Sequence, residues 1–98
     1  MAARAKVSRT EAPLERYLVA ECKRRGFLCP KAESLWPGAP DRLIVAKYEV
    51  IWVELKSPDG KLRPAQVATV KILKKLGQTV HVVRTREQVD AILGQCPV

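Results

Sequence analysis

The sequence predicts an α/β protein with elements in the order α-β-β-β-α-β-α, in which a mixed central sheet is flanked by helices. Stretches 11–25 and 64–76 carry apolar residues at helical spacing, and each is followed by a glycine that can end a helix. Between them, 42–53 consists of two short β-branched, apolar runs around a polar break, which is typical of an antiparallel hairpin. Apolar runs at 27–33 and 79–84 predict the remaining strands.

The first helix is predicted from apolar residues that repeat on one face. Leu14, Leu18 and Cys22 recur at four-residue spacing, so they form a stripe that a core can cover. Thr10 fits the N-cap position, and Gly26 fits the C-terminal stop. The helix is therefore expected to pack one face against the sheet and to expose the other.

Two acidic residues lie on or near the apolar side of this helix. At about 100° per residue, Glu15 falls inside the apolar arc, and Glu11 falls near it one turn earlier. A carboxylate that faces a core needs a partner or a metal ion. A partly exposed carboxylate near a helix start is also stabilised by the helix dipole. The helix alone leaves both interpretations of Glu15 open.

The strand expected at 27–33 is interrupted by Pro30, and a loop then leads to the hairpin. Residues 34–40 contain two prolines and one glycine, which favour a loop that delivers the chain to Asp41. Trp36 in this loop either stacks on a base or covers the edge of the core, and covering the core is the favoured interpretation.

The hairpin brings charged residues together at its open end. A turn centred between Lys47 and Tyr48 places Asp41 opposite Glu54, with β-carbons roughly 4.5–5.5 Å apart. Lys56 shares the face of Glu54. Two carboxylates about 4 Å apart repel by roughly 4 kcal/mol at an effective dielectric of about 20, and a bound Mg²⁺ or Mn²⁺ removes that repulsion. The alternative is that these charges lie on an open, solvated face.

A turn and a second helix follow the hairpin. Pro58-Asp59-Gly60 is a turn signature in which Gly60 supplies a positive φ angle, so Asp59 needs no catalytic role. The helix begins near Pro64 and directs Gln66 inward in its first turn. Its inward arc is predicted to hold Val67, Thr69, Val70, Ile72, Leu73 and Leu76, and its outward lysines Lys71, Lys74 and Lys75 either contact phosphates or are only solvated.

The C-terminal part adds one strand and one helix. His81 lies on the strand at 79–84 and is interpreted as a sheet-surface residue rather than a metal ligand. Thr85 and Gln88 fit a capping box that opens a helix running to about Leu93, with Gly94 as its end.

The composition indicates one small domain with a basic surface. In 98 residues, 18 lysines and arginines against 10 acidic residues give a net charge of +8, which favours a polyanionic partner such as nucleic acid, although a solvated basic surface is the alternative. Residues 1–9 are expected to form a flexible basic arm, and 10–98 a single domain. The three cysteines, Cys22, Cys29 and Cys96, are expected to be buried thiols.

The location of the protein is predicted from features that the sequence lacks. No apolar run approaches the roughly 20 residues that span a membrane, and no signal-peptide core follows the basic N-terminus, so we expect a cytoplasmic protein without a membrane partner. No glycine-rich phosphate-binding motif is present, so no nucleotide cofactor is expected.

Several motifs in order resemble the VRR-NUC family of the PD-(D/E)xK nuclease superfamily, whose core is restriction-endonuclease-like. The resemblance covers about residues 11–93, and in size the chain looks like the stand-alone phage or bacterial members that resemble Holliday junction resolvases. The segments that carry it are Leu14-Glu15-Arg16-Tyr17-Leu18-Val19, Lys31, Gly38-Ala39-Pro40-Asp41-Arg42-Leu43, Val53-Glu54-Leu55-Lys56, Gly60-Lys61-Leu62-Arg63-Pro64-Ala65-Gln66, Leu76-Gly77 and Val80-His81-Val82-Val83.

The resemblance implies an endodeoxyribonuclease that depends on Mg²⁺ or Mn²⁺ and hydrolyses phosphodiester bonds. Asp41, Glu54 and the backbone carbonyl of Leu55 would hold the metal, and Glu15 would reach it directly or through water, with a contribution of Glu11 left open. Lys56 would be the catalytic lysine, and Gln66 would orient that lysine or the attacking water. The implied catalytic residues are thus Glu15, Asp41, Glu54, Lys56 and Gln66.

The expected partner is DNA, in branched forms such as a Holliday junction or a flap. Because the chain is small, a homodimer is expected to place one active site on each strand of the branched substrate, in a bacterial or phage-infected host cell. The alternative is a non-catalytic or accessory DNA-binding module on the same fold. Basic residues expected to contact DNA are Lys31, Arg42, Lys61, Arg63, Lys71, Lys74 and Lys75.

Overall fold

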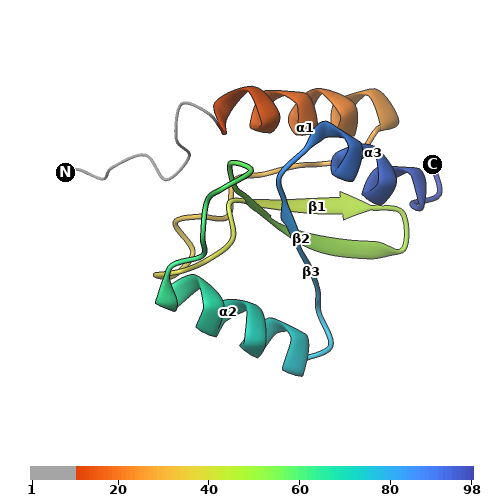
Figure 1. Cartoon of the computed structure of the whole chain (residues 1–98). Helices are drawn as coiled ribbons and strands as arrows, with labels where there is room; N and C mark the ends of the chain where they lie inside the picture. The colour runs from red at the N-terminus through yellow and green to blue at the C-terminus, as the bar shows by residue number, and fades with distance from the viewer. Residues whose placement is uncertain (1–10) are drawn as a thin grey trace.

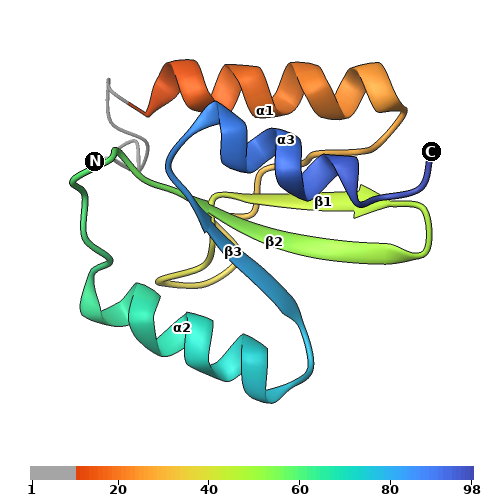
Figure 2. The same cartoon turned by 45° about the vertical axis from the view of Figure 1, so that its right-hand side comes forward.

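The computed structural model describes residues 11–98 and has an α/β fold with helices on both faces of one sheet (Figure 1). The expected arm at residues 1–9 and the N-cap Thr10 lie outside the described residues. In both views α1 and α3 cover one face of the sheet and α2 covers the other (Figure 2). The elements are α1 (Ala12–Arg25), β1 (Arg42–Ala46), β2 (Glu49–Leu55), α2 (Pro64–Lys75), β3 (Thr79–Val83) and α3 (Arg86–Gly94).

The sheet is mixed, as the sequence predicts. Its three strands lie in the order β1-β2-β3, with β1 antiparallel and β3 parallel to β2. The hairpin has the predicted register, because Leu43 pairs with Trp52 and Ile44 pairs with Ile51. One further step along this register sets Asp41 against Glu54. The predicted fold class is therefore confirmed.

The segment expected as the first strand lies beside β1 but is broken. Only isolated bridges form, from Leu28 to Val45 and from Lys31 to Arg42. Pro30 has no N–H to donate, although its carbonyl oxygen still accepts from the Leu43 N–H at 3.1 Å. The segment thus acts as an interrupted edge strand that covers the outer side of β1.

The core lies between the sheet and the helices α1 and α3. Alternating residues of β2 point into it, and all of them are buried. Because side chains alternate along a strand, the residues between them point toward α2. Besides Ile51, Val53 and Leu55 of β2, the core contains Leu14, Leu18 and Cys22 of α1, Ile44, Val83, and Val89 and Leu93 of α3.

Helix α2 packs through a narrower stripe than the sequence predicts. Gln66, Thr69 and Leu73 are its buried residues, whereas Ile72 is 57% exposed and Leu76, its C-cap residue, is 67% exposed. Val67, also expected inward, is exposed as well. The buried face of α2 was predicted too wide. A helix on a three-stranded sheet touches the sheet along one line, and helix residues about 100° away from that line face water.

The helix boundaries follow local signals. Gly26 and Gly77 have φ angles of 80° and terminate α1 and α2, respectively. Thr85 accepts from the Gln88 N–H, which confirms the capping box at the start of α3. Cys22 and Cys96 are buried, Cys29 is half-buried, and all three are thiols. Among residues 11–98, no helix combines the length and the apolar character that crossing a membrane requires.

Candidate active site

Two carboxylates are buried at the open end of the hairpin. Asp41 is 1% exposed and Glu54 is 2% exposed. The Leu55 N–H donates to Asp41 Oδ2 at 2.7 Å, so the Asp41 side chain is aimed at the end of β2. Burying a charge is costly unless it is paired, hydrogen-bonded or bound to a metal ion. Two acidic side chains so placed favour a cationic occupant.

Lys56 and Gln66 both contact one oxygen of Glu54. Gln66 Nε2 donates to Glu54 Oε2 at 2.9 Å, and the Lys56 ammonium lies 3.7 Å from the same oxygen. The Gln66 Oε1 accepts from the Arg63 N–H at 2.8 Å, which fixes which end of the amide faces Glu54. The predicted inward direction of Gln66 is confirmed, and the group that it touches is the carboxylate.

A close backbone contact brings α2 to the loop that precedes Asp41. Gly38 has a φ angle of 87°, and a β-carbon there would lie 2.6 Å from the carbonyl oxygen of Ala65. Only glycine permits this approach, which sets the first turn of α2, and hence Gln66, beside the loop. Trp36 closes the same side, since its Nε1–H donates to Thr69 at 3.2 Å and its ring lies 5.5 Å from that of Trp52. Trp36 thus covers this side of the sheet, as favoured from the sequence.

Glu15 is not brought to this cluster by its observed contacts. Arg42 Nε donates to Glu15 Oε2 at 2.9 Å, and its Nη1 donates to the Cys29 carbonyl oxygen at 2.7 Å. Arg42 pairs with Val53 and therefore points to the α1 side of the sheet, away from Glu54. The guanidinium predicted to contact DNA is thus held inside the protein by Glu15 and Cys29.

The thiol of Cys29 lies near the Arg42 guanidinium. A hydrogen bond with the Cys22 thiol lowers the pKa of the Cys29 thiol, burial opposes this shift, and the Arg42 guanidinium adds to the lowering. Cys29 therefore belongs to the polar contacts under α1 and is separate from the cluster around Glu54.

Glu11, the N-cap residue of α1, has a carboxylate that reaches the chain next to Lys56. It is 8% exposed, and its Oε2 accepts from the Ser57 N–H at 3.1 Å. Its position near the apolar arc was the signal in the sequence, but the angle alone does not tell how far along the sheet each turn of the helix lies. The Arg84 guanidinium donates to the Ser57 carbonyl oxygen at 2.9 Å, and no sequence motif pointed to Arg84.

The candidate metal ligands are oxygen atoms of the two buried carboxylates, Asp41 and Glu54. Within residues 11–98, there is no group of three or more histidine, cysteine, aspartate or glutamate side chains that could hold a metal ion. Mg²⁺ commonly binds through one or two carboxylates and keeps several waters. The carboxylates of Asp41 and Glu54 fit that oxygen-only preference.

The remaining basic residues predicted to contact DNA lie at the surface. All of them are exposed, on the edge segment, on the loop before α2 and on α2 itself. Their positions suit either contact with phosphates or solvation. They are Lys31, Lys61, Arg63, Lys71, Lys74 and Lys75.

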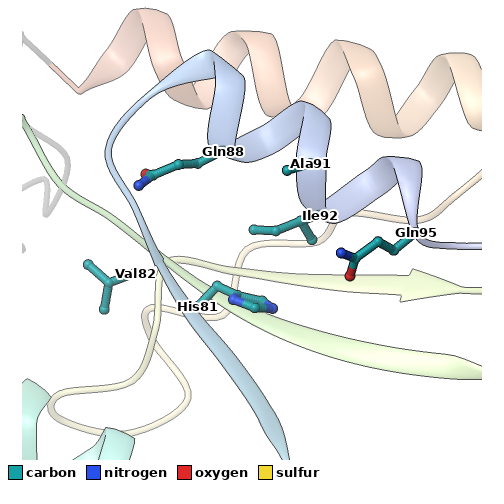
Figure 3. A pocket seen from close by; sticks show the side chains of 6 residues that line it. All are labelled: His81, Val82, Gln88, Ala91, Ile92 and Gln95. Atoms are coloured by element: carbon teal, nitrogen blue, oxygen red, sulfur yellow. The ribbon is translucent and has the colours of Figure 1, made fainter.

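A cavity of ≈ 260 Å³ lies elsewhere, between β3 and α3 (Figure 3). His81 points from β3 toward α3 there, so the cavity is on the face of the sheet away from Gln66 and Glu54. Its lining residues are His81, Val82, Gln88, Ala91, Ile92 and Gln95. The cavity is therefore separate from the candidate active site.

Comparison with known proteins supports one family. A solved structure described as a "VRR_NUC domain" matches with a TM-score of 0.80 and 26% sequence identity, and the match covers 90% of this chain and 98% of that chain. No family model matches the sequence. No curated protein matches it either. The structural match confirms the family resemblance that the motifs indicate.

Proposed function

This chain has the fold of a VRR-NUC nuclease domain, and on that basis we propose that it hydrolyses phosphodiester bonds in DNA with a divalent metal ion, Mg²⁺ or Mn²⁺. The observation that supports the proposal most is the burial of Asp41 and Glu54 on one face of the hairpin, with Lys56 and Gln66 on the same glutamate oxygen. The merely solvated face considered from the sequence does not account for carboxylates buried to this degree.

Each residue of the cluster has a proposed task. Asp41, Glu54 and the Leu55 carbonyl would hold the metal ion, which when bound supplies an activated water and charge neutralisation. Lys56 presents an ammonium that polarises the attacking water or neutralises the charge that develops at phosphorus. Gln66 holds Glu54 in one orientation through its hydrogen bond. A metal role of Glu15 stays a prediction, since its contact is with Arg42.

We propose that the substrate is branched DNA and that the protein acts as a homodimer. The net charge of +8 and the exposed lysines of α2 support DNA as the partner. A two-fold dimer presents two active sites, as the paired strands of a Holliday junction require.

A cleavage panel with Mn²⁺ on junction, flap and linear duplex DNA tests this substrate. We expect cutting of the branched substrates at least about tenfold faster than of linear duplex, which corresponds to about 1.4 kcal/mol. Light scattering is expected to give the mass of a dimer. Equal cutting of all three substrates, or a monomeric mass, contradicts the branched-DNA proposal and leaves the nuclease assignment intact.

A charge-removal series tests the lysines on the outer side of α2. Changing Lys71, Lys74 and Lys75 to Gln together is expected to weaken DNA binding and to lower the salt slope of log K by about 3, because each lysine neutralises about one phosphate. The measurement is fluorescence anisotropy with labelled DNA between low and moderate salt.

The control for this series carries the same change of charge elsewhere. Arg16, Lys23 and Lys47 are exposed and lie on α1 or at the far end of the hairpin, so their joint change to Gln should leave the salt slope within about 1 of the starting value. Equal slopes in both triple variants would show that the α2 lysines are only solvated.

A further inference from the structure

The turn that follows Lys56, formed by Ser57, Pro58, Asp59 and Gly60 and called here the 57–60 turn, folds back against the Lys56 side chain. A β-carbon on Gly60 would lie 3.5 Å from Lys56 Cδ and 2.9 Å from Ser57 Oγ. Gly60 is not among the glycines with a positive φ angle, which corrects the expectation from the turn signature. A side chain at this position would crowd Ser57 Oγ and come into van der Waals contact with the lysine stem, so the turn lies beside Lys56.

Arg84 holds this turn in place. Its Nη1 donates to the carbonyl oxygens of Ser57 at 2.9 Å and Gly60 at 2.5 Å, with a longer contact of 3.5 Å to that of Pro58. The Gly60 N–H in turn donates to the Ser57 carbonyl oxygen at 3.1 Å. The guanidinium therefore joins both ends of the turn, and hydrogen bonds from a charged donor are stronger than neutral ones.

The position of Arg84 is itself fixed by the start of α3. The Arg84 N–H donates to Gln88 Oε1 at 2.6 Å, and Gln88 belongs to the capping box with Thr85. Arg84 directly follows β3, and Val83, the last residue of that strand, accepts from the Lys56 N–H at 3.0 Å. Two consecutive residues therefore hold this part of the chain: Val83 binds the Lys56 backbone, and Arg84 binds the turn that follows it.

Glu11, the N-cap residue of α1, also holds this turn. Its carboxylate accepts from the Ser57 N–H, so Ser57 is bound through its N–H by Glu11 and through its carbonyl oxygen by Arg84. A lysine side chain has large rotamer freedom, which the packed turn restricts. The Lys56 side chain is 12% exposed, its ammonium lies 3.7 Å from Glu54 Oε2, and its Cδ lies next to Gly60 of the turn.

We infer that Arg84 is a positioning residue that keeps the Lys56 ammonium directed at Glu54 by holding the 57–60 turn against the lysine stem. The role of this contact in cleavage rests on the proposed nuclease function, whereas the restraint on Lys56 can be measured without DNA. A different role for Arg84, direct contact with DNA phosphates, predicts a change in substrate affinity instead.

The first experiment uses metal-free protein without DNA. NMR relaxation of the Lys56 side-chain methylene carbons and hydrogen exchange of the Ser57 and Gly60 amides are measured in Arg84→Ala and Arg84→Lys. We expect a more mobile Lys56 side chain and at least about tenfold faster amide exchange in the alanine variant. The lysine variant keeps a cationic donor, so its Lys56 mobility and its amide exchange rates should lie between those of the alanine variant and the wild type. Arg86→Ala removes the same charge two residues away and should match the wild type.

The second experiment measures cleavage with Mn²⁺ under steady-state conditions. Arg84→Ala is expected to lower kcat at least about tenfold with KM within about twofold, and Arg84→Lys should restore part of the rate. Unchanged kcat with raised KM in both variants would overturn the inference in favour of a DNA contact. Unchanged Lys56 mobility would overturn it whether or not the protein cuts DNA. If the wild type cuts no DNA, the proposed function fails, and Lys56 mobility still decides the inference.

Discussion

Replacing Asp41 with Asn is expected to lower DNA cleavage at least about 10³-fold while the protein stays folded. The amide oxygen can still accept the hydrogen bond that the Leu55 N–H gives to Asp41 Oδ2 at 2.7 Å, so the end of β2 keeps its support. The charge that would bind a metal ion is lost, and so is the repulsion from the neighbouring Glu54. Thermal unfolding of the metal-free variant checks that it stays folded.

Asp59 offers a matched control for this change. It follows a proline, as Asp41 does, but it lies exposed in the 57–60 turn. Asp59→Asn should leave the single-turnover cleavage rate with Mn²⁺ within about twofold of the wild type. Calorimetry should show Mn²⁺ binding in that variant and lose it in Asp41→Asn. Cleavage that survives Asp41→Asn would remove Asp41 from the proposed metal site and revive the non-catalytic DNA-binding module.

The second large effect is expected at Gly38. Changing it to Ala should destabilise the protein by about 2–5 kcal/mol, because a left-handed backbone costs a non-glycine residue about 1–2 kcal/mol and overpacking adds about 1–3. The added β-carbon would lie 2.6 Å from a backbone oxygen of α2, so the first turn of α2 must move. That movement takes Gln66 away from Glu54, and cleavage should fall together with stability.

Gly26 provides a control that separates the cost of the left-handed backbone from the cost of overpacking. Its φ angle of 80° is close to that of Gly38, but nothing lies within 4 Å of the position where its β-carbon would be. Gly26→Ala should therefore cost only about 1–2 kcal/mol and leave cleavage unaffected. Urea unfolding of both variants measures the difference, and equal losses of stability would refute the close contact between Gly38 and Ala65.

The hairpin could be predicted in detail because its geometry follows from counting residues. Pairing across an antiparallel turn has a constant sum of residue numbers, so one turn position determined that Asp41 lies opposite Glu54. Alternation along β2 then set Lys56 on the same side as Glu54. The inward direction of Gln66 followed from helical spacing and the proline at the helix start. These inferences need only local geometry, which the sequence determines strongly.

The contacts of the α1 carboxylates could not be predicted in the same way. A helical wheel gives the direction of Glu11 and Glu15 but not which strand residue lies beneath each, since that depends on how the helix is placed along the sheet. Arg42 lies beneath Glu15 and pairs with it. The exposed Ile72 and Leu76 of α2 were missed for a related reason, because apolar character does not report the width of the surface that a helix covers.

The pairing of Trp36 with Trp52 gives this protein a built-in optical reporter. They are the two tryptophans of the chain, and both lie on the α2 side of the sheet, with the Trp36 indole hydrogen-bonded to Thr69 of α2. Intrinsic tryptophan fluorescence therefore monitors the docking of the helix that carries Gln66, while the packing of α1 and α3 contributes little to the signal. Emission changes on adding metal ions or DNA can be followed in the unmodified protein, without an attached dye.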